Sequence, residues 1–521
     1  MKKNNVVKKV TKKFLTQNQR DFIKSKFVTK DIDSEHEKNV YSNNVNKKPI
    51  VMEDMSQRLA EQVVNYTEDI NNSEQKKLRE YYASKFDTAI LKDNQILYET
   101  RDGMSFTDSP KNIYEYLLHS EEFNNLQHVI VVAKRYRTNF DEFIANLPEN
   151  VSIVYRNSFE YIDALLESKY LFNNSTFQSF FVKRDNQIYI NTWHGTPLKK
   201  MGIDFIQANP KDMNNVRRNM LMADYLLSPN QHVTDMFLRA YQLNYSWQGK
   251  VLEGGLPRID NLFNGNPKEI IASLKRDGLV IDENKKNIVY MPTWQGKDPQ
   301  HISENMANDF AVFMSELTEN VGEKFNVLIK VHPYQFKFIK NDVRLKDKLI
   351  PDKYDPNEIL KITDSLITDF SSVFFDYLVT NKPIYFYNWN SDLYENDRGV
   401  YFKESELPGP VSHTLDELLV HLNDSKILKE FEPLYTKWKE TFTGHETGNV
   451  THDYVNYIFK EDRKSIKEVV EPLTGKKKLL FFRGHMGNNG ITQSFINLLN
   501  PDYSCTKFLT TAKSVKYNKL P

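Results

Sequence analysis

The feature that most constrains this chain is a change of rhythm near residue 86, after which short β-branched apolar runs alternate with longer amphipathic stretches. Strands that alternate with helices in this way build parallel sheets with helices on both faces. The array is long enough for two such sheets, with a break near residues 245–285, so a double α/β fold is predicted. The strand-like runs include residues 128–132, 151–155, 187–190, 287–290, 326–330, 365–368 and 383–387, and the helix-like stretches include 113–118, 233–241 and 373–378.

Composition supports a folded protein of several domains. With 521 residues, and with domains of about 100–200 residues each, two to four domains are expected. Because Cys505 is the single cysteine, an intrachain disulfide framework and a thiolate zinc site are both excluded. The net charge of +1 gives no general attraction to nucleic acid, so no such partner is expected. No run approaches the ~18 apolar residues that a membrane span requires.

The first 85 residues are polar and rich in lysine and asparagine, and the first thirty contain ten Lys or Arg against one acid, Asp21. Val7, Val10 and Phe14 fall at helical spacing with lysines between them, which predicts a short basic amphipathic helix on anionic lipid. The alternative is a solvated, partly disordered tail. The basic start is not followed by an apolar signal core, so we expect a protein on the cytoplasmic side, peripheral at the inner membrane face.

The last residues resemble the opening of another α/β domain. A strand-like run at 476–482 leads into Gly484, Gly487 and Gly490, and an amphipathic stretch follows at 491–499. We expect either the start of a further module or a short docked appendage. The expected division is a leader at 1–85, an N-terminal domain at 86–245, a C-terminal domain at 246–465 and this segment at 476–521.

Ligands of parallel α/β sheets lie beyond the carboxyl ends of the strands, so the residues after each predicted strand are the candidates for chemistry. The run at 188–191 leads into His194 and Gly195, and Pro197 suits the first turn of a following helix. A histidine at a strand end, with its near-neutral pKa, suits a general base for a hydroxyl nucleophile. The alternative is a structural histidine bound to backbone.

Two further strand ends carry groups that suit a phosphate. After the run at 287–290, Thr293 offers a hydroxyl and Lys297 a positive charge. After the run at 326–330 comes His332, which as a cation or as an N–H donor would stabilise phosphate oxygens or the departing group. The alternative for His332 is a histidine in a surface loop.

The fourth strand end, after residues 365–368, is the strongest local pattern. Asp369, Ser371 and Ser372 precede an apolar helix-like stretch, and aspartate and serine are favoured helix caps. The N–H groups and dipole of a helix start attract phosphate. Capping alone needs one such residue, whereas three are present. Asp369 repels phosphate, so we expect it to orient a neighbour or to meet the nucleotide sugar.

Other patterns of catalysis are absent from the sequence. It contains no Walker A pattern, no Gly-x-Gly-x-x-Gly and no Gly-x-Ser-x-Gly elbow. No His-x-x-x-His pair or acidic cluster indicates a catalytic metal, so none is expected. The pair Asp31 and Asp33 has a spacing used for metal-bound nucleotide sugars, but it lies in the polar leader and is expected to be solvated.

Six segments, in this order, resemble the CDP-glycerol glycerophosphotransferase family, the teichoic-acid primases and polymerases. Each is weak alone, but the six together are specific, and they span roughly residues 86–460. The segments are residues 192–197, 254–260, 291–294, 332–333, 369–372 and 409–411.

The resemblance implies two Rossmann-like domains of GT-B type that face a cleft. The N-terminal half would take a lipid-linked polymer acceptor, and the C-terminal half would take CDP-glycerol or CDP-ribitol, without a further cofactor. It implies that His194 is the base near the acceptor hydroxyl. Trp193, Gly195 and Thr196 would lie on the acceptor side.

For the donor, the resemblance implies that His332, Ser371 and Ser372 bind the pyrophosphate. Two positions depart from the family pattern. Gln295 stands where an arginine is common, and Phe370 stands where a tyrosine is usual. Lys297 would replace the missing cation less rigidly. The further donor contacts implied are Arg258, Thr293, Lys297 and Asp369.

The implied activity is transfer of a polyol phosphate to a hydroxyl of a teichoic-acid or other surface-polymer acceptor, with release of CMP. One alternative is a GT-B glycosyltransferase that uses a UDP-sugar in wall-polymer synthesis. An alternative of another class is a non-catalytic, membrane-associated scaffold. The segment 484–490 resembles the first loop of a GT-B glycosyltransferase, which would make the full protein bifunctional.

Overall fold

A computed structural model describes the greater part of the chain, and all of the described residues belong to one compact unit, residues 72–521. Residues 1–72 of the leader, which include its expected basic helix, lie outside the described residues, as do Lys297 and the Gly484–Gly490 loop. The rest of the leader, residues 73–85, is helical and buries Leu78 and Tyr82. The described ranges are 73–205, 213–245, 247–293, 304–389, 399–424, 426–472, 478–482 and 505–509.

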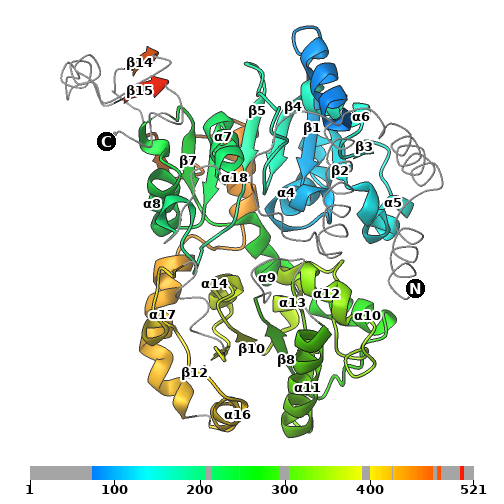
Figure 1. Ribbon diagram of the computed structural model, residues 1–521, viewed down its shortest axis with the longest axis vertical. Helices are drawn as coiled ribbons and strands as arrows, with labels where there is room; N and C mark the ends of the chain where they lie inside the picture. The colour runs from blue at the N-terminus through cyan, green and yellow to red at the C-terminus, as the bar shows by residue number, and fades with distance from the viewer. Residues whose placement is uncertain are drawn as a thin grey trace, which may run out of the picture. The chain divides into compact units, whose positions relative to one another are not determined.

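The first half of the described chain forms an eight-stranded sheet with the order β13-β7-β6-β5-β4-β1-β2-β3 (Figure 1). Neighbouring strands are parallel except β13, which runs antiparallel to β7. The alternation of apolar side chains buries both faces, as a parallel sheet requires. The strands are β1 (Lys92–Glu99), β2 (Gln127–Val132), β3 (Val151–Tyr155), β4 (Ser168–Asn173), β5 (Ile188–Asn191), β6 (Tyr225–Ser228), β7 (Lys250–Glu253) and β13 (Glu468–Val470).

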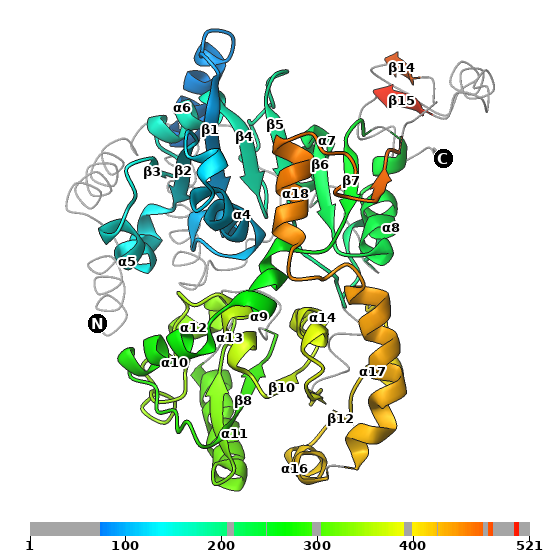
Figure 2. The ribbon, with the colours of Figure 1, turned by 180° about the vertical axis from the view of Figure 1, so that it is seen from behind.

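Helices cover both faces of this sheet. Leu97 of β1 faces the core that contains α6 (Phe159–Glu167), α7 (Asn214–Met222) and α8 (Gln231–Ala240). Its neighbour Tyr98 faces the opposite core, which contains α4 (Asp108–Leu118) and α18 (Val450–Phe459), the latter visible in front of the sheet in Figure 2. Local capping sets the starts of these helices: the side chain of Ser158 accepts from Tyr161 N–H before α6, and that of Asn230 from Val233 N–H before α8.

The second half forms a five-stranded, all-parallel sheet with the order β12-β11-β10-β8-β9. One face packs against α11 (Glu304–Val321), α12 (Pro333–Ile339) and α16 (Leu415–Asn423). The other packs against α9 (Asp260–Asn264), α10 (Pro267–Arg276), α13 (Pro356–Ile362), α14 (Val373–Tyr377) and α17 (Ile427–Thr443). The strands are β8 (Lys286–Met291), β9 (Phe325–Ile329), β10 (Ser365–Thr368), β11 (Ile384–Tyr387) and β12 (Val411–Ser412).

The chain passes between the two sheets twice, and the two crossing segments are joined to each other by hydrogen bonds. The outward crossing follows β7 and the return crossing joins α17 to α18. The Asp260 carboxylate on the outward crossing accepts from Val450 N–H at 3.0 Å and Thr451 N–H at 2.7 Å. Glu446 on the return crossing accepts from Leu256 N–H at 3.0 Å. Each crossing therefore satisfies backbone donors of the other.

Several expected elements differ from the structure. The expected boundary at residue 245 falls inside the first sheet, because β7, α18 and β13 all belong to it. No helix follows Pro197; instead Lys199 forms a backbone bridge with Val400 from the second half, which uses the polar groups that a helix would have paired. The strand expected at 476–482 is present as β14 (Lys478–Phe482), which pairs in parallel with β15 (Cys505–Leu509).

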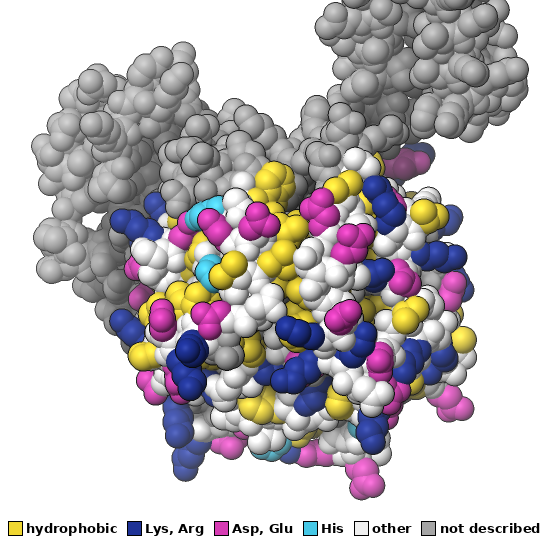
Figure 3. All heavy atoms as spheres, turned by 90° about the horizontal axis from the view of Figure 1, so that it is seen from below, with side chains coloured by type: hydrophobic (Ala, Val, Ile, Leu, Met, Phe, Trp, Pro, Cys, Tyr) yellow, Lys and Arg dark blue, Asp and Glu magenta, His cyan; other side chains and the backbone are white. Residues whose placement is uncertain are grey.

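The surface is mixed in charge, as the near-zero net charge leads one to expect. Basic and acidic side chains are interspersed over the face shown in Figure 3. Within the described residues, none of the helices combines the length and the apolar character that crossing a bilayer demands.

Candidate active site

A cavity of about 490 Å³ lies between the two sheets, at the carboxyl ends of their strands. This is the position at which parallel α/β sheets bind ligands, and its size is in the range of ~300–1,000 Å³ that small-molecule sites have. Segments that follow β1 and β5 line it from the first half, and segments that follow β8, β9 and β10 line it from the second. The predicted residues that line it are His194, Arg258, Thr293, His332, Ser371 and Ser372.

His194 is presented to this cavity by a strained turn at the end of β5. Its backbone is left-handed, with φ at 78°, and Gly195 follows with φ at 74°. A non-glycine residue held in this region is characteristic of functional sites. Two features favour glycine at position 195. Its backbone is left-handed, and an added Cβ would collide with Nη2 of Arg258.

The electrostatic surroundings keep His194 neutral. Its side chain is exposed to the cavity but lies deep among protein atoms. This loss of hydration, assisted by the nearby charge of Arg258, lowers the pKa of His194 to about 4. A neutral imidazole at pH 7 is able to accept a proton, as a general base must.

Next to His194, a partly buried network of three charges joins the two halves. Nη1 of Arg258 donates to Asp108 Oδ1 at 3.1 Å, and Nε donates to Asp376 Oδ2 at 2.8 Å. Asp108 is the first residue of α4 in the first half, and Asp376 lies on α14 in the second. Burial alone would lower the pKa of Arg258, but the two carboxylates raise it. Arg258 therefore stays charged and is held by both aspartates at the wall of the cavity.

His332 lies at the opposite wall, at the end of β9, and is half-buried. Burial, followed by the charges of Arg101, Lys199 and Lys330, lowers the pKa of His332 to about 4. At neutral pH the ring is therefore uncharged. His332 would then act as an N–H donor to a phosphate oxygen and not as a cation. The three neighbouring cations also line the cavity and suit an anionic ligand such as a diphosphate.

Asp369 lies behind the cavity wall and organises two segments that form it. Its Oδ1 accepts from Thr293 N–H at 2.7 Å, from the Thr293 hydroxyl at 2.6 Å and from Ser371 N–H at 3.1 Å. Burial raises the pKa of Asp369, and the hydrogen bonds from Thr293 oppose that shift. Of the two roles considered for Asp369, orienting its neighbours is the one that this geometry supports.

The serines line the cavity in a setting that differs from the expected helix cap. The helix that follows, α14, has only five residues, and Ser372 makes no side-chain cap hydrogen bond. Its hydroxyl instead accepts from Leu198 N–H at 3.0 Å and so reaches the His194 loop. Among the described residues, the hydroxyl of Ser371 makes one long contact, 3.5 Å, with Val373 N–H. A helix of five residues contributes only a small dipole. Phosphate binding at this position would therefore depend more on hydrogen bonds from the serine side chains.

The residues predicted on the acceptor side support the His194 loop. The Trp193 ring packs edge-on against His194, with ring centroids 5.1 Å apart, and against Tyr241. The hydroxyl of Thr196 accepts from the Asn230 amide at 2.8 Å. Neither side chain lines the cavity.

Other cavity residues were not predicted. Arg101 follows β1, Lys330 follows β9, and Asp355 accepts from Asp108 N–H at 2.7 Å across the two halves. Arg101 and Asp108 have left-handed backbones, with φ at 47° and 68°. The strand-end rule would have found Arg101 if β1 had been among the expected strands. No local sequence pattern predicts that Asp355 lies at the cavity.

The comparisons with known proteins agree with this geometry. The family model described as CDP-Glycerol:Poly(glycerophosphate) glycerophosphotransferase matches residues 80–460. The teichoic acid poly(glycerol phosphate) polymerase of Bacillus subtilis strain 168 is 30% identical over 77% of this chain and 54% of its own length. The teichoic acid glycerol-phosphate transferase of Staphylococcus aureus strain NCTC 8325 is 30% identical over 73% of this chain and 96% of its own. The chain thus spans about half the length of the Bacillus polymerase.

Among solved structures, a histidine variant of the wall teichoic acid polymerase TagF, soaked with CDPG, matches with a TM-score of 0.62 and 26% identity. The match covers 78% of this chain and 99% of that one. The predicted fold class is therefore confirmed: two Rossmann-like domains of the GT-B type.

Proposed function

The chain belongs to the CDP-glycerol:poly(glycerophosphate) glycerophosphotransferase family, and from that membership we propose that it transfers a polyol phosphate from a CDP-polyol to a hydroxyl of a teichoic-acid acceptor. The observation that carries the proposal is the shared cavity. Two neutral histidines line it, His194 from the first half and His332 from the second. Ser371 and several basic side chains line the same cavity.

The donor binds at the second half. His332 donates an N–H to a pyrophosphate oxygen, and the Ser371 hydroxyl donates to another. Arg101, Lys199 and Lys330 supply positive charge around them. Family relatives named for glycerol-phosphate and for ribitol-phosphate transfer support a CDP-polyol as the donor class. CDP-glycerol is the specific donor that we propose, because relatives that match 77% and 73% of this chain at 30% identity carry glycerol-phosphate names.

The transfer step uses the histidine of the first half. An oxygen of the acceptor hydroxyl attacks the polyol-linked phosphorus, and His194 takes the hydroxyl proton. A new P–O bond to the acceptor forms, the P–O bond to the CMP phosphate breaks, and CMP leaves with the electron pair. Phosphoryl transfer depends mainly on positioning and charge stabilisation, which this cavity supplies. Arg258 and Asp369 act as positioning residues, since the first holds the two halves and the second holds Thr293 and Ser371.

We further propose that the acceptor is a lipid-linked polymer and that the protein works at the inner face of the cell membrane. The basic residues among the first thirty support electrostatic attachment to anionic lipid. Deletion of residues 1–30 is expected to reduce sedimentation with anionic liposomes, while neutral liposomes serve as the control. Unchanged sedimentation would end the membrane proposal and leave the transferase proposal standing.

Mass spectrometry of a defined lipid-linked acceptor tests the reaction itself. The acceptor is incubated with CDP-glycerol, CDP-ribitol or a UDP-sugar in separate reactions, and the nucleotide released is measured. We expect the mass of one or more glycerol phosphates to be added, with an equal amount of CMP. Addition of a sugar with release of UDP would favour the glycosyltransferase alternative, and binding of none of these nucleotides would favour a scaffold.

A further inference from the structure

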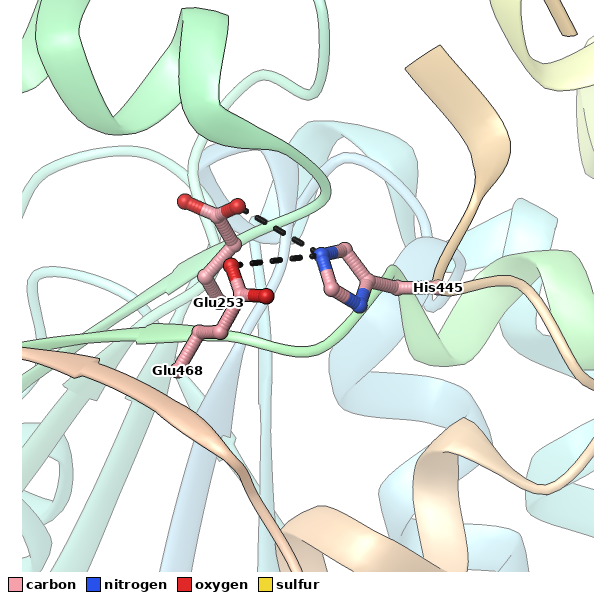
Figure 4. A group of neighbouring side chains, drawn as sticks. All are labelled: Glu253, His445 and Glu468. Atoms are coloured by element: carbon pink, nitrogen blue, oxygen red, sulfur yellow. Dashed lines mark ion pairs between the residues drawn. The ribbon is translucent and has the colours of Figure 1, made fainter. Parts of the chain in front are cut away.

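Three ligand-type side chains from distant segments meet at the edge of the first sheet. Glu253 ends β7, Glu468 begins β13, and His445 lies on the return crossing between α17 and α18. Figure 4 shows both carboxylates directed at the same imidazole nitrogen. None of the three lines the active-site cavity, and the proposed reaction does not use them.

The distances suit a bound metal ion. Nε2 of His445 lies 3.4 Å from Glu253 Oε1 and 3.8 Å from Glu468 Oε2, and the three ligand atoms all lie within 4.8 Å of one another. An ion with Zn–N and Zn–O bonds of about 2.0–2.2 Å holds tetrahedral ligand atoms roughly 3.4 Å apart. Small side-chain adjustments would therefore bring all three atoms into its coordination sphere.

The charges of the group also call for a cation. Glu253 and Glu468 are directly opposite in the register of the antiparallel β7–β13 pair. Like charges at such positions destabilise the pairing. Glu253 is buried, and its Oε2 accepts from the Thr234 hydroxyl at 2.5 Å, so Oε1 is the atom turned to His445. Even a protonated imidazole would balance only one of the two carboxylates, whereas a divalent ion balances both.

We propose that Glu253, His445 and Glu468 bind a divalent transition-metal ion, for which Zn²⁺ is the best match. One nitrogen and two carboxylate oxygens form a donor set that zinc accepts, and water completes the coordination on the exposed side of Glu468. The ion fastens β13 and the return crossing to β7. The site is structural, and it is independent of the transferase proposal. The sequence predicted no metal site because its three ligands share no local spacing.

Zinc binding to the full-length chain tests this directly. The purified protein is stripped with a chelator, dialysed and titrated with ZnCl₂ by calorimetry. We expect one ion to bind per chain and to raise the thermal unfolding midpoint. Glu468→Gln and His445→Ala should each weaken zinc binding at least ~10-fold, with circular dichroism used to confirm that both variants fold. Glu468 is more than half exposed, so its variant is expected to fold normally.

His452→Ala is the matched control, because His452 pairs with one carboxylate, Asp453, at 3.0 Å. This variant should bind zinc as the wild type does. Anomalous scattering at the zinc edge should then place the ion between β7 and β13. The proposal is overturned if zinc does not bind, or if it binds equally to Glu468→Gln, His445→Ala and the wild type; the three side chains would then form an ion-pair group alone.

Discussion

The two histidine loops of the cavity have a common plan but are held in different ways. Each follows a parallel strand, and each ring has its pKa lowered to about 4. The His332 loop is held in part by its own turn: the His332 carbonyl accepts from Gln335 and Phe336 N–H at the start of α12. The His194 loop depends on distant residues, because Arg258 packs against Gly195 and Ser372 accepts from Leu198 N–H. A strand end can therefore position a histidine by its own turn or by partners elsewhere in the chain.

We propose that His194 takes the proton in the chemical step, so its removal should have the largest effect. We expect His194→Ala to lower kcat by ~10²–10⁴, the usual contribution of a general base, with affinity for CDP-glycerol retained. CMP release measures the rate and calorimetry measures the affinity. CMP release near the wild-type rate would exclude His194 as the base.

The long-range support of the His194 loop should appear in stability. Arg258→Met leaves Asp108 and Asp376 buried without their cation, and we expect it to lower the free energy of unfolding by about 3–5 kcal/mol. Arg239→Met, which removes an exposed ion pair with Asp204, is the matched control and should cost less than about 1 kcal/mol. Denaturant unfolding measures both. Equal losses would show that the network does not hold the halves together.

We propose that His332 binds the pyrophosphate of the donor, so both the rate and the donor affinity should fall when it is removed. We expect His332→Ala to reduce kcat and the affinity for CDP-glycerol each by roughly ten-fold, because one charge-assisted hydrogen bond to the pyrophosphate is lost. Steady-state kinetics and calorimetry separate the two quantities. Undiminished affinity and turnover would leave His332 without the role proposed for it.

The glycine and the proline beside the two histidines provide a finer comparison. Gly195→Ala forces a side chain into a left-handed position and against Arg258, so we expect about a ten-fold loss of kcat. Pro333→Ala, at the first turn of α12, should change kcat less than about two-fold because an alanine is accepted there. The same assay of CMP release compares both variants. A larger loss in Pro333→Ala would reverse the assignment of which loop is the more constrained.

The smallest expected effect is in the pH profile. A lowered pKa keeps the imidazole of His194 neutral below its usual 6.5, and protonation removes the base only as the pH falls toward 4. The acid limb of kcat/KM should therefore have its midpoint below pH 6.5 in the wild type and in His332→Ala. In His194→Ala the residual rate should lose this limb. A limb that persists unchanged in His194→Ala belongs to another group.

The strands and the residues at strand ends were predicted from local patterns. Such patterns can be recognised in the sequence alone. The runs at 128–132, 151–155 and 365–368 are present as β2, β3 and β10. The inner strands β2 and β10 are buried on both faces and so leave a continuous apolar signature, whereas β3 lies at the sheet edge with Ser152 and Tyr155 exposed. The inner strand β1 is less visible, since its first four residues are Lys-Asp-Asn-Gln and only its second half is apolar.

What the sequence does not express is contact between distant segments. Arg258 was predicted as a donor contact from its motif, yet its two carboxylate partners come from α14 and from the residues that start α4. The helix expected after Pro197 is replaced by the bridge from Lys199 to Val400 for the same reason. Tertiary hydrogen bonds override local preference at such places, and they surround the cavity.

A structure of the His194→Ala variant with CDP-glycerol bound is the most direct test of the central claim. We expect the pyrophosphate between His332 and Ser371, with the polyol-linked phosphorus turned toward the position of the missing imidazole. Nucleotide bound at any other surface, with the cavity between the two sheets holding only water, would contradict it.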